Sequence, residues 1–198
     1  MAALKIKFNL ATCLTWLRIA LIPVVVGVYY LPDYVFQLSM AQKNMVSMLA
    51  FIVAALTDWL DGYIARNYNQ TSAFGAFLDP VADKLMVAAA LCVLMELDRV
   101  NAALGFLIIG RELTISALRE WMASSGKRAS VAVNSLGKFK TIAQMVAIPM
   151  LLLDAAMPFY QSWHSRSVGT ALLLVAALLT VVSMVYYFRM ASKALKTK

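Results

Sequence analysis

The sequence of 198 residues contains little charge: Asp, Glu, Lys and Arg make up 14% of it, against roughly 25% in ordinary soluble domains. It has only two cysteines, Cys13 and Cys92, and both lie inside apolar runs, which excludes a disulfide framework and a thiolate metal site. Glycine and proline are also scarce, with 8 and 5 residues, so a collagen-like or linker-dominated chain is excluded.

Apolar residues are abundant, at 62% of the chain, and the mean hydropathy is +0.75. Charged and proline positions divide the chain into six apolar segments, each close to the ~17–25 residues that cross a bilayer as a helix. These segments are 10–31, 44–65, 80–97, 100–118, 141–157 and 167–188. We therefore predict an all-α integral membrane protein with six transmembrane helices in a single domain, residues 1–198. Residues 1–12 alternate basic and apolar side chains, which predicts a short interfacial helix before the first span.

The formal net charge of +8 could indicate a nucleic-acid partner, so the positions of the basic residues decide its meaning. With six spans and a cytoplasmic N-terminus, the outer side receives Lys43, Arg99 and Arg166, and the inner side receives the other fifteen basic residues. This asymmetry follows the positive-inside rule and predicts that both termini are cytoplasmic. It favours a membrane topology signal over nucleic-acid binding.

Ionisable residues inside the predicted spans gather at the cytoplasmic level of the membrane. Burying one at the bilayer centre costs about 2.5–3.5 kcal/mol on insertion scales, so such residues usually mark a site. The residues at this level are Arg18, Asp58, Asp61, Asp79, Asp83, Lys84, Arg111 and Glu112. Four separate segments thus contribute charge to one level, which predicts a polar site there.

The densest stretch is TDWLDGYIARNYNQTSAFGAFLDPVADK, residues 57–84. On a helix Asp58 and Asp61 share a face with the small residues Gly62 and Ala65, and Arg66 at the helix end is placed to meet phosphates. This face leaves room for a ligand beside two carboxylates.

After a polar turn, Asp79 precedes Pro80, a pair typical of a helix N-cap and first helical position. Asp83 follows one turn later on the same face. Two helices would therefore present two carboxylates each across one gap.

Four carboxylates in a low-dielectric gap need cations, because like charges oppose one another's ionisation. Oxygen ligands select hard cations such as Mg²⁺ or Mn²⁺, and paired metals are typical of displacement at phosphorus. The spacing alone leaves alternatives open. Asp58 and Asp61 could form a solvated turn, Asp79 could be a simple cap, and intramembrane carboxylates could serve a cation-coupled transporter.

Residues 58–83 contain eight residues at fixed spacings: Asp58, Asp61, Gly62, Ala65, Arg66, Gly75, Asp79 and Asp83. This pattern resembles the complete signature of the CDP-alcohol phosphotransferase family, with no departure. The flanking segments NLATCLTWLRIALIP and IIGRELTISALREWMASSGKRASVAVNSLGKFKTIAQM resemble the bacterial members that use glycerol 3-phosphate as acceptor.

The resemblance implies that the four aspartates hold two divalent cations, Mg²⁺ or Mn²⁺, over the diphosphate of CDP-diacylglycerol. It implies that Asp83 is also the general base on the acceptor hydroxyl, so that CMP leaves and phosphatidylglycerol phosphate forms. The residues that it assigns to CDP-diacylglycerol are Gly62, Ala65, Arg66 and Gly75. It further implies a homodimer in the bacterial cytoplasmic membrane, with the active site toward the cytoplasm.

An acceptor phosphate needs cations beyond those that meet the diphosphate. Arg111 and Arg119 are eight residues apart, on one face of a helix, and Lys138 and Lys140 follow across a polar connection at about 119–140. Arg18 would enter from the first helix. The alternatives are that the lysines touch anionic headgroups and that Glu112 and Glu120 orient the arginines. Other family members use inositol phosphate, serine or phosphatidylglycerol, so the acceptor rests on the flanking resemblance.

Overall fold

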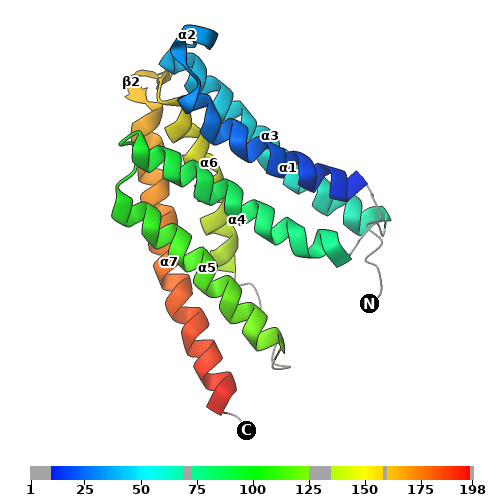
Figure 1. The fold of residues 1–198 in the computed structure, drawn as a ribbon. Helices are drawn as coiled ribbons and strands as arrows, with labels where there is room; N and C mark the ends of the chain where they lie inside the picture. The colour runs from blue at the N-terminus through cyan, green and yellow to red at the C-terminus, as the bar shows by residue number, and fades with distance from the viewer. Residues whose placement is uncertain (1–9, 69–72, 125–134, 158–159, 197–198) are drawn as a thin grey trace. The chain divides into compact units, whose positions relative to one another are not determined.

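The computed structural model describes residues 10–68, 73–124, 135–157 and 160–196 (Figure 1). The predicted interfacial helix at 1–12 lies almost wholly outside these residues. The described chain forms six long helices and a small hairpin. The long helices are α1 (Leu10–Gly27), α3 (Met40–Tyr68), α4 (Ala73–Glu96), α5 (Ala102–Ser124), α6 (Ser135–Leu153) and α7 (Ser165–Lys196). The short elements are η1 (Val28–Tyr30), α2 (Asp33–Phe36), β1 (Ala156–Met157) and β2 (Tyr160–His164).

The fold departs from a purely helical one at the hairpin, where β1 pairs antiparallel with β2 and Ala156 faces His164. The predicted span 141–157 is too long at its end, because α6 ends at Leu153. Asp154 follows with φ of 45°, a left-handed conformation that Asp tolerates better than most residues and that ends a helix.

The chain divides into two compact units. The first unit comprises Met1–Val93 with Leu152–Ala155, and the second unit comprises Leu94–Leu151 with Ala156–Lys198. In the first unit α1 packs along α3, and Figure 1 shows the two helices side by side. The Ser47 hydroxyl of α3 donates to the Val25 carbonyl of α1 at 3.0 Å. Phe51 and Ala54, further along α3, are buried.

In the second unit α5 packs on α7 (Figure 1). Ile115 and Met122 of α5 form a buried cluster with Tyr187 and Ala191 of α7. Helix α6 approaches α7 closely at Gly169, where an added Cβ would lie 2.8 Å from Leu151 Cγ and 3.1 Å from the Ala147 carbonyl oxygen. Gly169 therefore permits a close approach that a larger residue would disturb.

Among the described residues, three helices are long and apolar enough to cross a membrane, over Cys13–Tyr30, Met40–Leu60 and Ser165–Ser192. Helix α6 adds a shorter apolar stretch, Phe139–Leu153. Large apolar side chains on these helices face outward, among them Leu56 and Leu178, as expected where lipid covers the surface. These helices confirm the predicted class of integral membrane protein. The six crossings and the orientation of the termini stay predictions.

Three further predicted helix boundaries are wrong. Helix α4 begins at Ala73, so Pro80 lies inside it and Asp79 is not an N-cap. Pro80 removes one backbone N–H donor, but the helix continues on both sides of it, so the proline interrupts the hydrogen bonding of α4 without ending it. Helices α5 and α6 likewise extend into the predicted polar connection, so Arg119, Lys138 and Lys140 are helical residues.

The Gly169 contact yields a stability prediction. We expect Gly169→Ala to lower the free energy of unfolding by about 1–3 kcal/mol, the usual cost of overpacking, since the Ala147 backbone cannot rotate away. Thermal unfolding in detergent measures this. The matched control is Gly110→Ala in α5, where nothing lies within 4 Å of the added Cβ and alanine favours the helix. Equal melting temperatures for the two variants would contradict the prediction.

Candidate functional site

In the first unit, one buried arginine joins carboxylates from two helices. Arg18 of α1 is 1% exposed; its Nη2 lies 3.2 Å from Asp58 Oδ1 of α3, and its Nη1 lies 2.5 Å from Asp83 Oδ1 of α4. Thr15, three residues earlier on α1, donates its hydroxyl to Asp79 Oδ1. A single face of α1 therefore contacts three of the four predicted site aspartates.

The carboxylates of Asp58 and Asp83 contact the buried Arg18 on one side and are partly exposed on the other. The side chains of Asp58 and Asp83 are 46% and 39% exposed, although the guanidinium between them is buried. Asp79 and Asp83 lie one turn apart on α4, as the sequence predicted, in spite of the earlier start of the helix. The predicted convergence of carboxylates from α3 and α4 is therefore present for Asp58 and Asp83.

The donor chemistry of this site fits a hard divalent cation. Its ligands would be carboxylate oxygens, and Asp58 and Asp83 already converge on one positive group. Among the residues whose side chains are described, no three His, Cys, Asp or Glu residues form a ligand group. The side chain of Asp61, the fourth predicted ligand, lies outside the described residues, although Asp61 belongs to α3.

The predicted CDP-diacylglycerol residues are only partly described. Gly62, Ala65 and Arg66 belong to α3, and their side-chain positions lie outside the described residues. Gly75 lies in the first turn of α4 and is buried. The structure therefore places these residues on the two helices that carry the aspartates and leaves their predicted roles as predictions.

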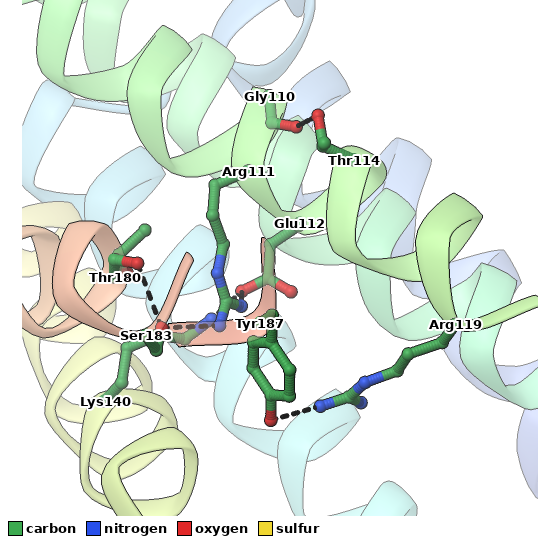
Figure 2. A network of polar contacts seen from close by, with 9 residues as sticks. All are labelled: Gly110, Arg111, Glu112, Thr114, Arg119, Lys140, Thr180, Ser183 and Tyr187. Atoms are coloured by element: carbon green, nitrogen blue, oxygen red, sulfur yellow. Dashed lines mark hydrogen bonds and ion pairs between the residues drawn. The ribbon is translucent and has the colours of Figure 1, made fainter. Parts of the chain in front are cut away.

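In the second unit, cations of α5 and α6 meet one carboxylate and two hydroxyls (Figure 2). Arg111, 7% exposed, donates from Nη2 to Ser183 Oγ at 2.8 Å and from Nη1 to Glu112 Oε1 at 3.3 Å. Lys140 of α6, 2% exposed, forms an ion pair with the same Glu112 oxygen. Arg119 donates from Nη2 to the Tyr187 hydroxyl at 2.6 Å.

This network carries excess positive charge. Within the described residues the network contains three cations, Arg111, Arg119 and Lys140, and one carboxylate, that of Glu112, so the formal charge of the network is +2. Both arginines are near enough to repel the Lys140 ammonium group. Arg111 Nε and Arg119 Nε are buried and have no hydrogen-bond partner within the described part of the chain. Such donors suit an anionic ligand.

Several predicted acceptor residues meet here, and one is found elsewhere. Arg111, Arg119 and Lys140 belong to this network, and Glu112 orients Arg111 as one alternative proposed. Lys138 belongs to α6, but its side chain lies outside the described residues. Arg18 contacts the carboxylates of the first unit instead.

Sequence reasoning missed three hydroxyl residues, Thr15, Ser183 and Tyr187. Thr15 had a signal, since it lies three residues before Arg18 on an otherwise apolar helix. Ser183 and Tyr187 are spaced four residues apart in α7, but this spacing has no meaning until the helix packed against it is known.

Apolar helices of membrane-crossing length that carry an acidic cluster and a cationic network define an integral membrane protein with a polar functional site. The chain belongs to the CDP-alcohol phosphatidyltransferase family, whose model matches residues 8–186. The family that the signature at 58–83 predicted is therefore confirmed, and the match covers residues of both units.

Individual relatives agree with this family. A protein of Salmonella choleraesuis named CDP-diacylglycerol–glycerol-3-phosphate 3-phosphatidyltransferase is 48% identical over 186 residues, which cover 91% of this chain and 93% of the relative. Proteins of the same name from Shigella flexneri and Haemophilus influenzae are 47% and 42% identical, over 91% and 96% of this chain and 93% and 96% of their own lengths.

The Arg18 contacts yield a second prediction. We expect Arg18→Gln to lower the free energy of unfolding by about 1–3 kcal/mol, because Asp58 and Asp83 lose their shared counter-charge. The effect should stay below the 3–5 kcal/mol of a fully buried pair, since both carboxylates are partly exposed. Chemical unfolding in detergent checks it, with Lys84→Gln as a control that removes the same charge beside Asp83. An equal effect of both substitutions would refute a specific role of Arg18.

Proposed function

We propose that this chain transfers the phosphatidyl group of CDP-diacylglycerol to glycerol 3-phosphate, forming phosphatidylglycerol phosphate and releasing CMP. The relatives named for this reaction support the proposal, because they match the chain over nearly its whole length at 42–48% identity. The structural observation that carries it is the +2 network of Arg111, Arg119 and Lys140 with Glu112.

The charge of this network suits the acceptor. A phosphate monoester carries about −1.5 to −2 at neutral pH, which matches a formal charge of +2. Arginine presents several donors in a planar fork that fits phosphate oxygens, and lysine contributes a compact charge. Arg111, Arg119 and Lys140 would bind the acceptor phosphate, with Lys138 and Arg18 as further candidates from the sequence. Serine, which lacks a phosphate, would gain little from this network.

The acidic residues suit the donor substrate. Asp58, Asp61, Asp79 and Asp83 would hold divalent cations, Mg²⁺ or Mn²⁺ and two per site, against the diphosphate of CDP-diacylglycerol. When bound, such ions neutralise phosphate charge and lower the pKa of a nearby hydroxyl. Gly62, Ala65 and Gly75 would leave space beside the nucleotide and diphosphate, and Arg66 would pair with phosphate oxygens.

Asp83 would act as the general base. Its carboxylate would accept the proton of the primary hydroxyl of glycerol 3-phosphate as the hydroxyl oxygen bonds to the phosphorus that carries diacylglycerol. The bond from this phosphorus to the CMP oxygen breaks, and CMP leaves with the electron pair. Arg18, which contacts Asp83 Oδ1, would hold the carboxylate in place.

The membrane arrangement follows from the same reaction. CDP-diacylglycerol keeps its acyl chains in the bilayer, so a site at the inner headgroup level receives lipid laterally and exchanges glycerol 3-phosphate and CMP with the cytoplasm. We propose six spans with both termini cytoplasmic, in the bacterial cytoplasmic membrane, and a homodimer as the family resemblance implies.

An acceptor panel tests the proposed function. Purified protein in detergent, given CDP-diacylglycerol and Mg²⁺, should release CMP with glycerol 3-phosphate and much less with inositol phosphate or serine. Asp83→Asn should reduce release by about 100-fold or more, the usual contribution of a general base. CMP is measured by chromatography.

Each result of this panel has one meaning. Release with a different acceptor would keep the transferase and overturn the acceptor. Metal-dependent release with no acceptor would sink the proposal in favour of hydrolysis. Ion flux into vesicles without CMP release would favour the cation-coupled transporter that the carboxylates alone left open.

Metal removal gives a separate prediction. Incubation with a chelator should bring CMP release to background, and Mg²⁺ or Mn²⁺ should restore it, because four carboxylates select hard cations. Ca²⁺, which prefers more ligands at longer distances, should restore much less. Full activity after exhaustive chelation would refute the assignment of the aspartates as metal ligands.

A further inference from the structure

Two residues of α7 hold the two arginines of α5. Ser183 and Tyr187 are each 1% exposed and lie one helical turn apart. Ser183 accepts from Arg111 at 2.8 Å and Tyr187 accepts from Arg119 at 2.6 Å. The arginines are eight residues apart, about 12 Å along α5, whereas their partners are four residues apart, about 6 Å along α7. Figure 2 shows both arginine side chains reaching from α5 to these hydroxyls.

Both hydroxyls have fixed positions. Ser183 donates its own hydrogen to the Thr180 carbonyl at 2.9 Å, which orients its oxygen toward Arg111. The Tyr187 ring is part of the buried cluster with Ile115, Met122 and Ala191, so its hydroxyl lies at the end of an immobilised ring. An arginine held by such a partner has already lost much of its rotamer freedom before a ligand binds.

A hydroxyl holds a cation without cancelling its charge. Glu112 pairs with Arg111 and Lys140 and neutralises one positive charge. Within the described residues, the hydrogen-bond partner of Arg119 is the neutral hydroxyl of Tyr187, so its full charge remains for a ligand. The Nε donors of both arginines are buried without a partner in the same described part.

We propose that Ser183 and Tyr187 are positioning residues for the acceptor phosphate: they fix the guanidinium groups of Arg111 and Arg119 without neutralising them. This inference rests on the proposed function, since it takes the acceptor to be a phosphate bound by these arginines. The two hydroxyls act through the arginines and not on the reacting atoms. Their loss should therefore weaken acceptor binding and leave the chemical step unchanged.

The test uses Tyr187→Phe and Ser183→Ala, which remove one hydroxyl each and keep the surrounding packing. CMP release is measured against glycerol 3-phosphate concentration and, separately, against CDP-diacylglycerol concentration. We expect the KM for glycerol 3-phosphate to rise about 10- to 150-fold in each variant, the range for losing a hydrogen bond to a charged group. The kcat and the KM for CDP-diacylglycerol should change less than twofold.

The adjacent tyrosine is a matched control. Tyr186 lies in a T-shaped arrangement with Tyr187, its ring centroid 6.0 Å away, and is 41% exposed. Tyr186→Phe should leave both KM values and kcat unchanged. Melting temperatures of all variants accompany the kinetics, because a merely structural role would lower stability and kcat without a selective effect on the acceptor.

The outcomes separate this inference from the proposed function. An active wild-type enzyme whose KM for glycerol 3-phosphate is unchanged in both variants overturns the positioning role alone. An equal rise in both KM values, or a fall in kcat with lower melting temperature, also overturns it. Wild-type protein that releases no CMP with glycerol 3-phosphate overturns the proposed function and this inference with it.

Discussion

The structure depends on the pairing of charges that its apolar helices carry. A cation taken from water into a low-dielectric interior is stabilised by an acid from a neighbouring helix, because a lone buried charge costs several kcal/mol. Arg18 meets this requirement with Asp58 and Asp83, and Lys140 meets it with Glu112. Each pair joins residues distant in sequence, so charge pairing ties helices together within each unit.

The two networks have opposite formal charge, so each suits a ligand of the opposite sign. In the first unit the described carboxylates of Asp58, Asp79 and Asp83 outnumber the guanidinium of Arg18, which leaves a formal charge of −2. In the second unit the network of Arg111, Arg119, Lys140 and Glu112 has a formal charge of +2. An acidic cluster attracts metal cations and a cationic one attracts phosphate, so the two requirements of the proposed reaction would be met by separate sets of helices.

Sequence periodicity predicted what a single helix determines. It placed Asp79 above Asp83 and Arg111 on the face of Arg119, because residue spacing fixes direction within one helix. It failed at Pro80, because proline is typical of a first helical position but is also tolerated where residues on both sides of it continue the helix. It also could not find Ser183 or Tyr187, since a hydroxyl in an apolar helix looks the same whether it bonds its own backbone or a neighbour's arginine.

The single carboxylate of Glu112 reflects a balance between holding cations and using them. Without any acid, Lys140 would be a buried charge beside two arginines that repel it. With an acid for every cation, the network would be neutral and would have little attraction for a phosphate. The Glu112 carboxylate pairs with Lys140 and Arg111, and neutral hydroxyls also hold the guanidinium groups of Arg111 and Arg119. The charged carboxylate and the neutral hydroxyls together fix the cationic side chains, and the network keeps its net charge of +2.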